Sequence, residues 1–179
     1  MIKIMIYSAL GIGSIIALVI AIGAALPVRH VAASRISLHR SPAEVFALIS
    51  DFQSAPSWRR GVKQVTLLPP EQGHQRFIEI GEKESITMEV PESSGPGRLV
   101  TAIADKSLPY GGSWIFEISP TQEGSILQIT ERGEVYNPFF RFVSRFVLGY
   151  KKTMNNYLSD VAKHFAEKTQ PSDATPSNS

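Results

Sequence analysis

The sequence predicts an α+β protein in which an antiparallel sheet of about seven strands packs on a long C-terminal helix, with one transmembrane helix before them. Three observations support this prediction. Residues 5–26 form an uncharged apolar run, short extended segments divided by turn residues fill the middle of the chain, and residues 138–168 carry apolar side chains at helical spacing.

The apolar run is long enough for a membrane span. At about 1.5 Å per helical residue, residues 5–26 reach roughly the 30 Å of a bilayer's hydrocarbon core. We therefore expect residues 1–28 to be a single-pass membrane anchor. The anchoring side chains would be Met5, Leu10, Ile16, Leu18, Ile22 and Leu26.

A secretory signal peptide is the alternative for this segment, because Lys3 precedes an apolar core that ends in small residues. The side of the membrane that would hold the large domain stays unresolved. Lys3 lies before the run, whereas Arg29, Arg35 and Arg40 follow it. The count of positive charges favours a cytoplasmic domain, but the short positive start favours translocation of the domain across the membrane.

Small residues recur every four positions in the run, at Gly13, Ala17, Ala21 and Ala25. Such spacing places them on one helix face and would allow a second helix to approach closely, as in a homodimer. Alanine and glycine are also common in apolar helices that have no partner. Both interpretations stay open.

A single domain is expected over residues 29–168. Its first element is a strand at residues 31–39, where apolar and polar side chains alternate. A helix follows, because Ser41 and Glu44 can form a capping box and Pro42 lies where its missing N–H costs nothing. A turn and a very short helix then lead to Trp58.

Six further extended segments come next, separated by proline and glycine turns. They cover residues 62–68, 75–80, 84–90, 98–105, 113–118 and 126–135. Their close spacing favours hairpins and hence an antiparallel meander.

Asn137 and Pro138 then predict the start of a helix that continues to about residue 168. Gly149 falls in its middle, where glycine costs about 1 kcal/mol relative to alanine. Either close packing against the sheet or a bend beside a cavity would account for this glycine, and both stay open. Residues 169–179 are mostly Ser, Thr, Pro, Asp and Asn, and we expect a disordered tail there.

Two segments resemble a known superfamily. They are residues 38–58, with the run Leu-His-Arg-Ser-Pro-Ala-Glu-Val-Phe and a later Pro-Ser-Trp, and residues 129–138, Ile-Thr-Glu-Arg-Gly-Glu-Val-Tyr-Asn-Pro. Both resemble the START-like or SRPBCC superfamily, which includes polyketide cyclase/dehydrase, lipid-transport and Bet v 1-like proteins, some with an N-terminal membrane span. The resemblance implies a helix-grip fold, in which a curved sheet wraps around the last helix. It does not choose among binding and catalytic functions.

The sequence contains few of the motifs that are typical of catalytic sites. The chain has no cysteine, its four histidines are scattered, and it lacks a nucleophile elbow and a phosphate loop, so no metal, cofactor or catalytic residue is assigned. A net charge of +2 without a basic stripe argues against nucleic acid as a partner. The charges around Glu131, Glu134 and Arg141 are interpreted as solvated or structural ion pairs, although acid–base chemistry stays open.

Apolar and aromatic side chains are more informative about a possible binding site. In a grip fold the sheet can curve away from the helix and leave a cavity, which is the usual form of a small-molecule site. The residues expected to line it are Trp58, Ile86, Met88, Trp114, Phe116, Phe139, Phe142, Val143, Phe146 and Tyr150.

Three functions are compatible with these features of the chain. The leading one is a membrane-anchored domain that binds an apolar molecule, such as a lipid or an isoprenoid. The alternatives are a cyclase or dehydratase acting on a polyketide-like substrate, and a module that interacts with another membrane protein without any ligand.

Overall fold

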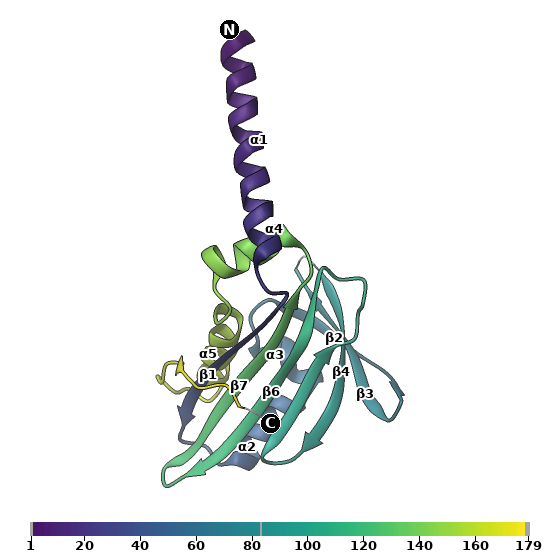
Figure 1. The fold of residues 1–179 in the computed structure, drawn as a ribbon. Helices are drawn as coiled ribbons and strands as arrows, with labels where there is room; N and C mark the ends of the chain where they lie inside the picture. Colours follow the sequence, from purple (N-terminus) through teal and green to yellow (C-terminus); the bar gives the residue numbers. More distant parts are fainter. Residues whose placement is uncertain (1, 83, 178–179) are drawn as a thin grey trace.

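An eight-stranded antiparallel sheet is the largest element of the computed structural model (Figure 1). The structure describes residues 2–82 and 84–177, with the side chains of residues 2–6, 8 and 9 left aside. The strand order is β2-β3-β4-β5-β6-β7-β1-β8. The bounds are β1 Arg29–Leu38, β2 Val62–Glu71, β3 His74–Gly81, β4 Ser85–Ser94, β5 Arg98–Ile103, β6 Tyr110–Thr121, β7 Gly124–Val135 and β8 Ser172–Asp173.

Consecutive strands from β2 to β7 pair with one another, which confirms the predicted meander. Strand β1 lies next to β7, on the side opposite β6. It pairs there along its whole length, from Arg29 opposite Glu134 to Leu38 opposite Ser125. The pairing brings the N-terminal end of the domain beside the C-terminal end of β7.

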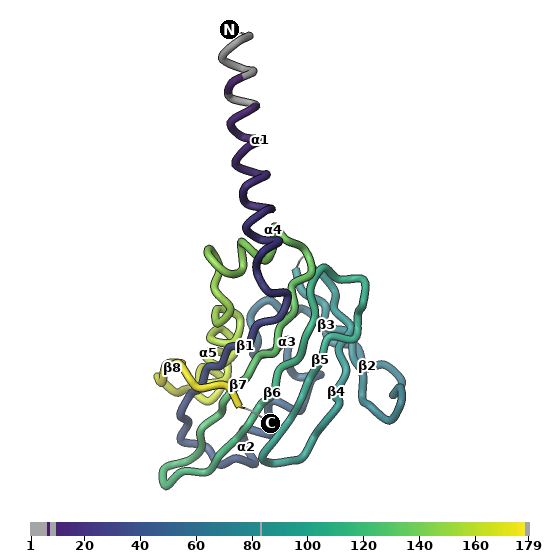
Figure 2. The backbone as a smooth tube through the Cα atoms, viewed as in Figure 1, coloured from purple at the N-terminus to yellow at the C-terminus, as the bar shows by residue number. Residues whose placement is uncertain are grey.

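Helix α1 (Ile2–Ala25) extends away from the sheet (Figures 1 and 2). Leu10, Ile16, Leu18 and Ile22 are exposed, Leu26 is half-buried, and the side chain of Met5 lies outside those described. The sequence predicts a transmembrane helix here. Within the part of the chain that the structure describes, no helix is both long and apolar enough to cross a membrane.

The predicted capping box is confirmed at helix α2 (Pro42–Ser50). The hydroxyl of Ser41 accepts the amide N–H of Glu44, and the Glu44 carboxylate accepts the amide N–H of Ser41. A 3₁₀ turn, η1 (Phe52–Ser54), and the short helix α3 (Ala55–Trp58) follow, as expected from the sequence.

The prediction of one continuous helix after β7 is wrong. The segment consists of α4 (Pro138–Val143), a π-helical turn η2 (Ser144–Leu148) and α5 (Lys152–His164). Gly149 lies between η2 and α5 with φ of +73° and ψ of 154°, a conformation that is essentially restricted to glycine. The glycine therefore ends the helix, whereas Asn137 caps its start as predicted.

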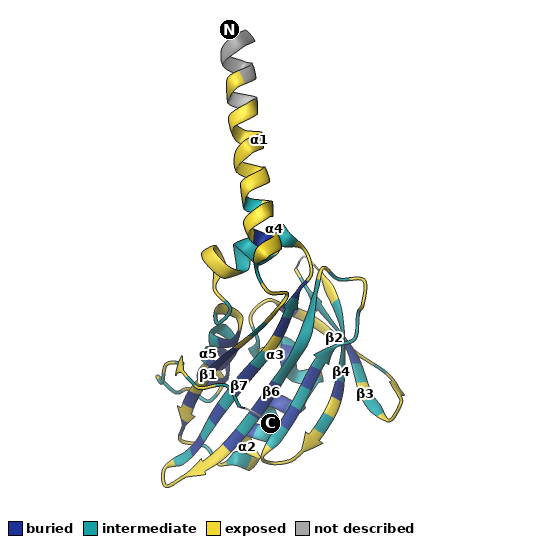
Figure 3. Ribbon diagram, viewed as in Figure 1, coloured by how far each residue is buried: buried dark blue, intermediate teal, exposed yellow. Residues whose placement is uncertain are grey.

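Only α5 of this segment is anchored in the core. Met154, Leu158 and Val161 are almost fully buried against the sheet, together with Val45 of α2 and Ile129 of β7 (Figure 3). In contrast, neither α4 nor η2 contains a buried residue.

The C-terminal tail pairs with the free edge of β1 and then crosses to β7. Ser34 and Arg35 pair with Asp173 and Ser172, and the amide of Ser177 donates to Thr130 Oγ1 at 3.2 Å. This differs from the disorder expected of residues 169–179. An exposed strand edge offers unpaired N–H and C=O groups, and a segment with little to bury can still satisfy them.

Candidate ligand cavity

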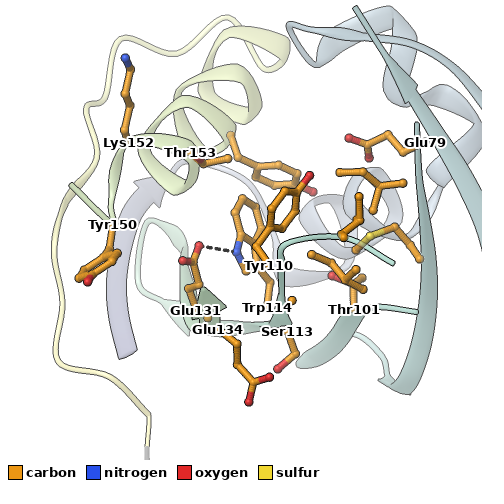
Figure 4. Close-up of a pocket in the computed structure, with 18 of the residues that line it drawn as sticks. Glu79, Thr101, Tyr110, Ser113, Trp114, Glu131, Glu134, Tyr150, Lys152 and Thr153 are labelled. Carbon is orange, nitrogen blue, oxygen red and sulfur yellow. Dashed lines mark hydrogen bonds between the residues drawn. The ribbon is translucent and has the colours of Figure 1, made fainter. Parts of the chain in front are cut away.

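A cavity of about 820 Å³ lies between the concave side of the sheet and the C-terminal segment (Figure 4). Strands β3 to β7 form one side of it, and residues of α2, α3, α4, η2 and α5 complete the wall. Its volume falls within the roughly 300–1,000 Å³ typical of small-molecule sites. The fold therefore leaves a real space where the sheet diverges from the helices.

Seven of the ten residues expected to line a cavity lie on its wall. They are Trp58, Ile86, Met88, Trp114, Phe116, Val143 and Tyr150. Phe139, Phe142 and Phe146 are not part of the lining, whereas Phe140 is. The break at Gly149 and the wider repeat of the π turn interrupt the single helical stripe that predicts these three positions.

Tyr157 of α5 is the centre of an aromatic cluster in the wall. Its ring lies 5.4 Å from Trp58, 5.7 Å from Trp114 and 5.4 Å from Phe116, measured between ring centroids. The two tryptophans meet it edge to face, a favourable arrangement for aromatic rings. Burial raises the pKa of the Tyr157 hydroxyl, which therefore stays protonated at neutral pH.

Glu131 brings a carboxylate into this largely apolar wall. One oxygen accepts the indole N–H of Trp114 at 2.7 Å (Figure 4), and the other lies 2.8 Å from His30 Nε2. The side chains of Glu131 and His30 are only 16% and 12% exposed. Of the two interpretations, a solvated or a structural ion pair, only the structural one fits Glu131, because strand pairing turns its side chain inward.

His30 and Glu131 are 101 positions apart in the sequence, so their proximity could not be read from local spacing. The sheet register produces it, since His30 lies opposite Gly133 and Trp114 lies opposite Glu131. A β-carbon at Gly133 would lie 2.3 Å from His30 Cε1. Gly133, two residues after Glu131, leaves the space that the His30 ring occupies. This role of the glycine becomes visible only when the pairing of β1 with β7 is known.

Other ionisable groups in the wall are also paired within the protein. Arg59 donates two hydrogen bonds to Glu79, at 2.6 and 3.1 Å, and its guanidinium lies 5.0 Å from the Tyr157 ring centroid. The hydroxyl of Tyr110 donates to Glu84 at 2.5 Å. Burial is the main cause that raises the pKa of Tyr110, and this hydrogen bond is the second. These carboxylates are thus provided with donors before any ligand enters.

The lining of the cavity is mostly apolar. Among the residues that the structure describes, no three His, Asp or Glu side chains come together as a metal site would require. Glu134, also on the wall, accepts from Arg29 and Tyr136, in agreement with the ion pairs expected at this junction.

Residues 29–167 match the family model described as polyketide cyclase / dehydrase and lipid transport. The chain belongs to this family. The match confirms the resemblance carried by residues 38–58 and 129–138 at the level of the family. Comparison with curated protein sequences gave no match.

Solved structures agree with this assignment at the level of the fold. A START superfamily protein from Mycobacterium smegmatis superposes with a TM-score of 0.57 at 16% identity, covering 75% of this chain and 99% of that one. The di-domain ARO/CYC StfQ from the steffimycin biosynthetic pathway gives 0.61 at 13% identity, covering 78% and 52%. Norcoclaurine synthase from Thalictrum flavum gives 0.61 at 11% identity, covering 78% and 88%. The family member described here therefore has the helix-grip fold.

Proposed function

We propose that this protein binds an apolar small molecule, of lipid or isoprenoid type, in the cavity between the sheet and the C-terminal segment. The main support for this proposal is a large and mostly apolar cavity in which Glu131, Glu79 and Glu84 each already accept a hydrogen bond from a protein donor. An apolar ligand would bury its surface there without leaving these charges unpaired.

The test is organic extraction of the purified full chain, followed by mass spectrometry. Ile86 lines the cavity, so Ile86→Trp should obstruct it, whereas Leu67→Trp adds the same side chain to an exposed site on β2 away from the lining. We expect an apolar compound to be recovered from the wild type and from Leu67→Trp but lost from Ile86→Trp. Equal recovery from all three, or none from any, would contradict the proposal.

A cyclase or dehydratase is the second candidate, favoured by the ionisable pair of Glu131 and His30 in the cavity wall. A half-buried carboxylate beside an imidazole is able to move a proton if a substrate lies against it. Dehydration would release one water, so substrate and product would differ by that mass. Accumulation of the heavier species in Glu131→Gln would support this candidate, and an unchanged set of bound compounds would remove it.

The membrane is the proposed location, with a single pass by α1 and an unresolved side for the domain. Support comes from the uncharged residues 5–26 and from the exposure of Leu10, Ile16 and Leu18. Ile16→Lys combined with Leu18→Lys should release the full chain from membranes into the aqueous fraction. Retention of this variant in the membrane fraction would argue against the anchor.

A homodimer through the small residues of α1 is a further proposal. Gly13, Ala17, Ala21 and Ala25 are all exposed and could admit a second helix. Ala17→Leu with Ala21→Leu should reduce crosslinking between two copies in bilayers. Unchanged crosslinking would exclude this face.

A further inference from the structure

The segment formed by α4 and η2, residues 138–148, has the composition of a surface that contacts lipid. Its exposed large side chains are Phe139, Phe140, Phe146, Val147 and Leu148. Phe146 and Val147 are 59% and 69% exposed, which is unusual for neighbouring large apolar residues. Contiguous apolar groups on a surface commonly mark a site of interaction.

Charge distinguishes the kind of partner. Residues 138–152 contain the four cations Arg141, Arg145, Lys151 and Lys152 and no carboxylate, and of these Lys151 pairs with Asp173 at 2.8 Å. Basic residues beside exposed aromatic and aliphatic side chains are typical of segments that rest on anionic lipid. An apolar protein partner would give no reason for this one-sided charge.

The segment also lies against the base of α1. Arg141 Nη1 donates to the carbonyl oxygen of Leu26 at 2.7 Å. Gly23 approaches Pro138 so closely that a β-carbon at Gly23 would overlap the Pro138 carbonyl. The base of α1 is therefore packed on α4, and Figure 3 shows buried and intermediate residues at this junction, with the exposed apolar side chains of α1 and of residues 138–148 on either side of it.

The same segment also closes part of the cavity, and Phe140 and Leu148 belong both to its exposed surface and to the cavity lining. Phe140, Val143, Ser144 and Leu148 all belong to the lining. Because α4 and η2 bury no residue of their own, the core does not hold them as it holds α5. One short segment thus separates the cavity from the surface that α1 approaches.

We propose that residues 138–148 form a lipid-docking lip, which inserts Phe146 and Val147 into the interfacial layer of an anionic bilayer and brings the adjoining cavity wall to the membrane. The proposal that this lip docks on lipid rests on the exposure of its side chains, its charge and its contact with α1. It does not depend on what occupies the cavity. A protein with an empty cavity would still show it.

The cysteine-free chain allows a direct test with single cysteines in the full-length protein. Val147→Cys places an environment-sensitive NBD label on the lip, and Gln122→Cys places the same label on the exposed β6–β7 turn. Each protein is reconstituted in nanodiscs of phosphatidylcholine with phosphatidylglycerol. Unchanged thermal unfolding of both labelled proteins establishes that the label leaves the fold intact.

We expect a blue shift of the label at position 147 and quenching by spin-labelled lipid, with neither effect at position 122. Arg145→Gln should lower the quenching at position 147 in discs with phosphatidylglycerol but not in discs of phosphatidylcholine alone. Equal behaviour of the two labels would overturn the proposal. So would a blue shift without lipid quenching that appears only when two copies share a disc, since a second copy would then cover the surface.

Discussion

The imidazole of His30 stacks on the phenol ring of Tyr150, with ring centroids 3.7 Å apart and planes inclined by 14°. His30 lies near the start of β1, shortly after α1, and Tyr150 directly follows the break at Gly149. The stack therefore fastens the end of the lip to the sheet. Since His30 also contacts Glu131, one side chain links the lip to the polar part of the cavity.

Gly133→Ala should disturb this link. Its β-carbon would lie 2.3 and 2.4 Å from His30 Cε1 and Nε2, so the ring has to move away from Glu131 and Tyr150. We expect a loss of about 1–3 kcal/mol in the free energy of unfolding, the usual cost of overpacking. Urea denaturation measures it.

Gly97→Ala is the matched control for this substitution, because a β-carbon there meets nothing within 4 Å. It should change the free energy of unfolding by no more than about 0.5 kcal/mol, as surface substitutions usually do. Equal losses in the two variants would show that His30 does not need the space above Gly133.

Glu131 should tolerate glutamine better than leucine. Glutamine keeps polar atoms for Trp114 and His30, so the expected cost is about 1 kcal/mol. Leucine would leave the Trp114 N–H and His30 Nε2 without their partner, at about 1–3 kcal/mol for each unsatisfied group. Urea denaturation gives both values, and a leucine variant as stable as the glutamine variant would contradict the hydrogen-bonding role.

Gly149→Ala tests the break between η2 and α5. Nothing lies within 4 Å of a β-carbon at this position, so any cost comes from the backbone at φ of +73°. We expect a destabilisation of about 1–3 kcal/mol, measured by urea denaturation. A neutral or stabilising effect would mean that the segment readily becomes the continuous helix that the sequence predicts.

Local signals in the sequence were sufficient for most of the fold. Ser41, Pro42 and Glu44 act within four residues of one another, and the turns of the meander are equally local. The break at Gly149 was not predictable in the same way. A helical pattern of apolar residues continues across it, and only the three-dimensional path shows that the glycine adopts a positive φ.

The cavity was predictable in kind but only partly in detail. Trp114 and Phe116 share a strand face, so they reach the same space whatever the exact register. Glu131 and His30 required the pairing of β1 with β7, a contact between the two ends of the domain. The sequence places Phe139, Phe142 and Phe146 on one stripe of a continuous helix, and the chain does not form this helix as one piece.

Stability at alkaline pH should report the burial of Tyr157. Burial raises its pKa in the folded state, whereas an unfolded tyrosine ionises near pH 10. The contribution is therefore present below about pH 10 and declines as the pH rises further, by at most about 1.4 kcal/mol per pH unit. Tyr157→Phe lacks this group, so its unfolding free energy should fall less steeply between about pH 9 and pH 11. Parallel curves for the two proteins in urea denaturation would contradict the burial of the hydroxyl.

Photo-crosslinking tests the central claim of an apolar binding cavity most directly. The full chain in nanodiscs is irradiated with a fatty acid that carries a diazirine, and the labelled peptides are mapped by mass spectrometry. We predict labels on β4, β6 and α5 near Met88, Trp114 and Tyr157, and their loss in Ile86→Trp but not in Leu67→Trp. Labels confined to α1 and to residues 138–148, with none in the cavity wall, would contradict the proposed function.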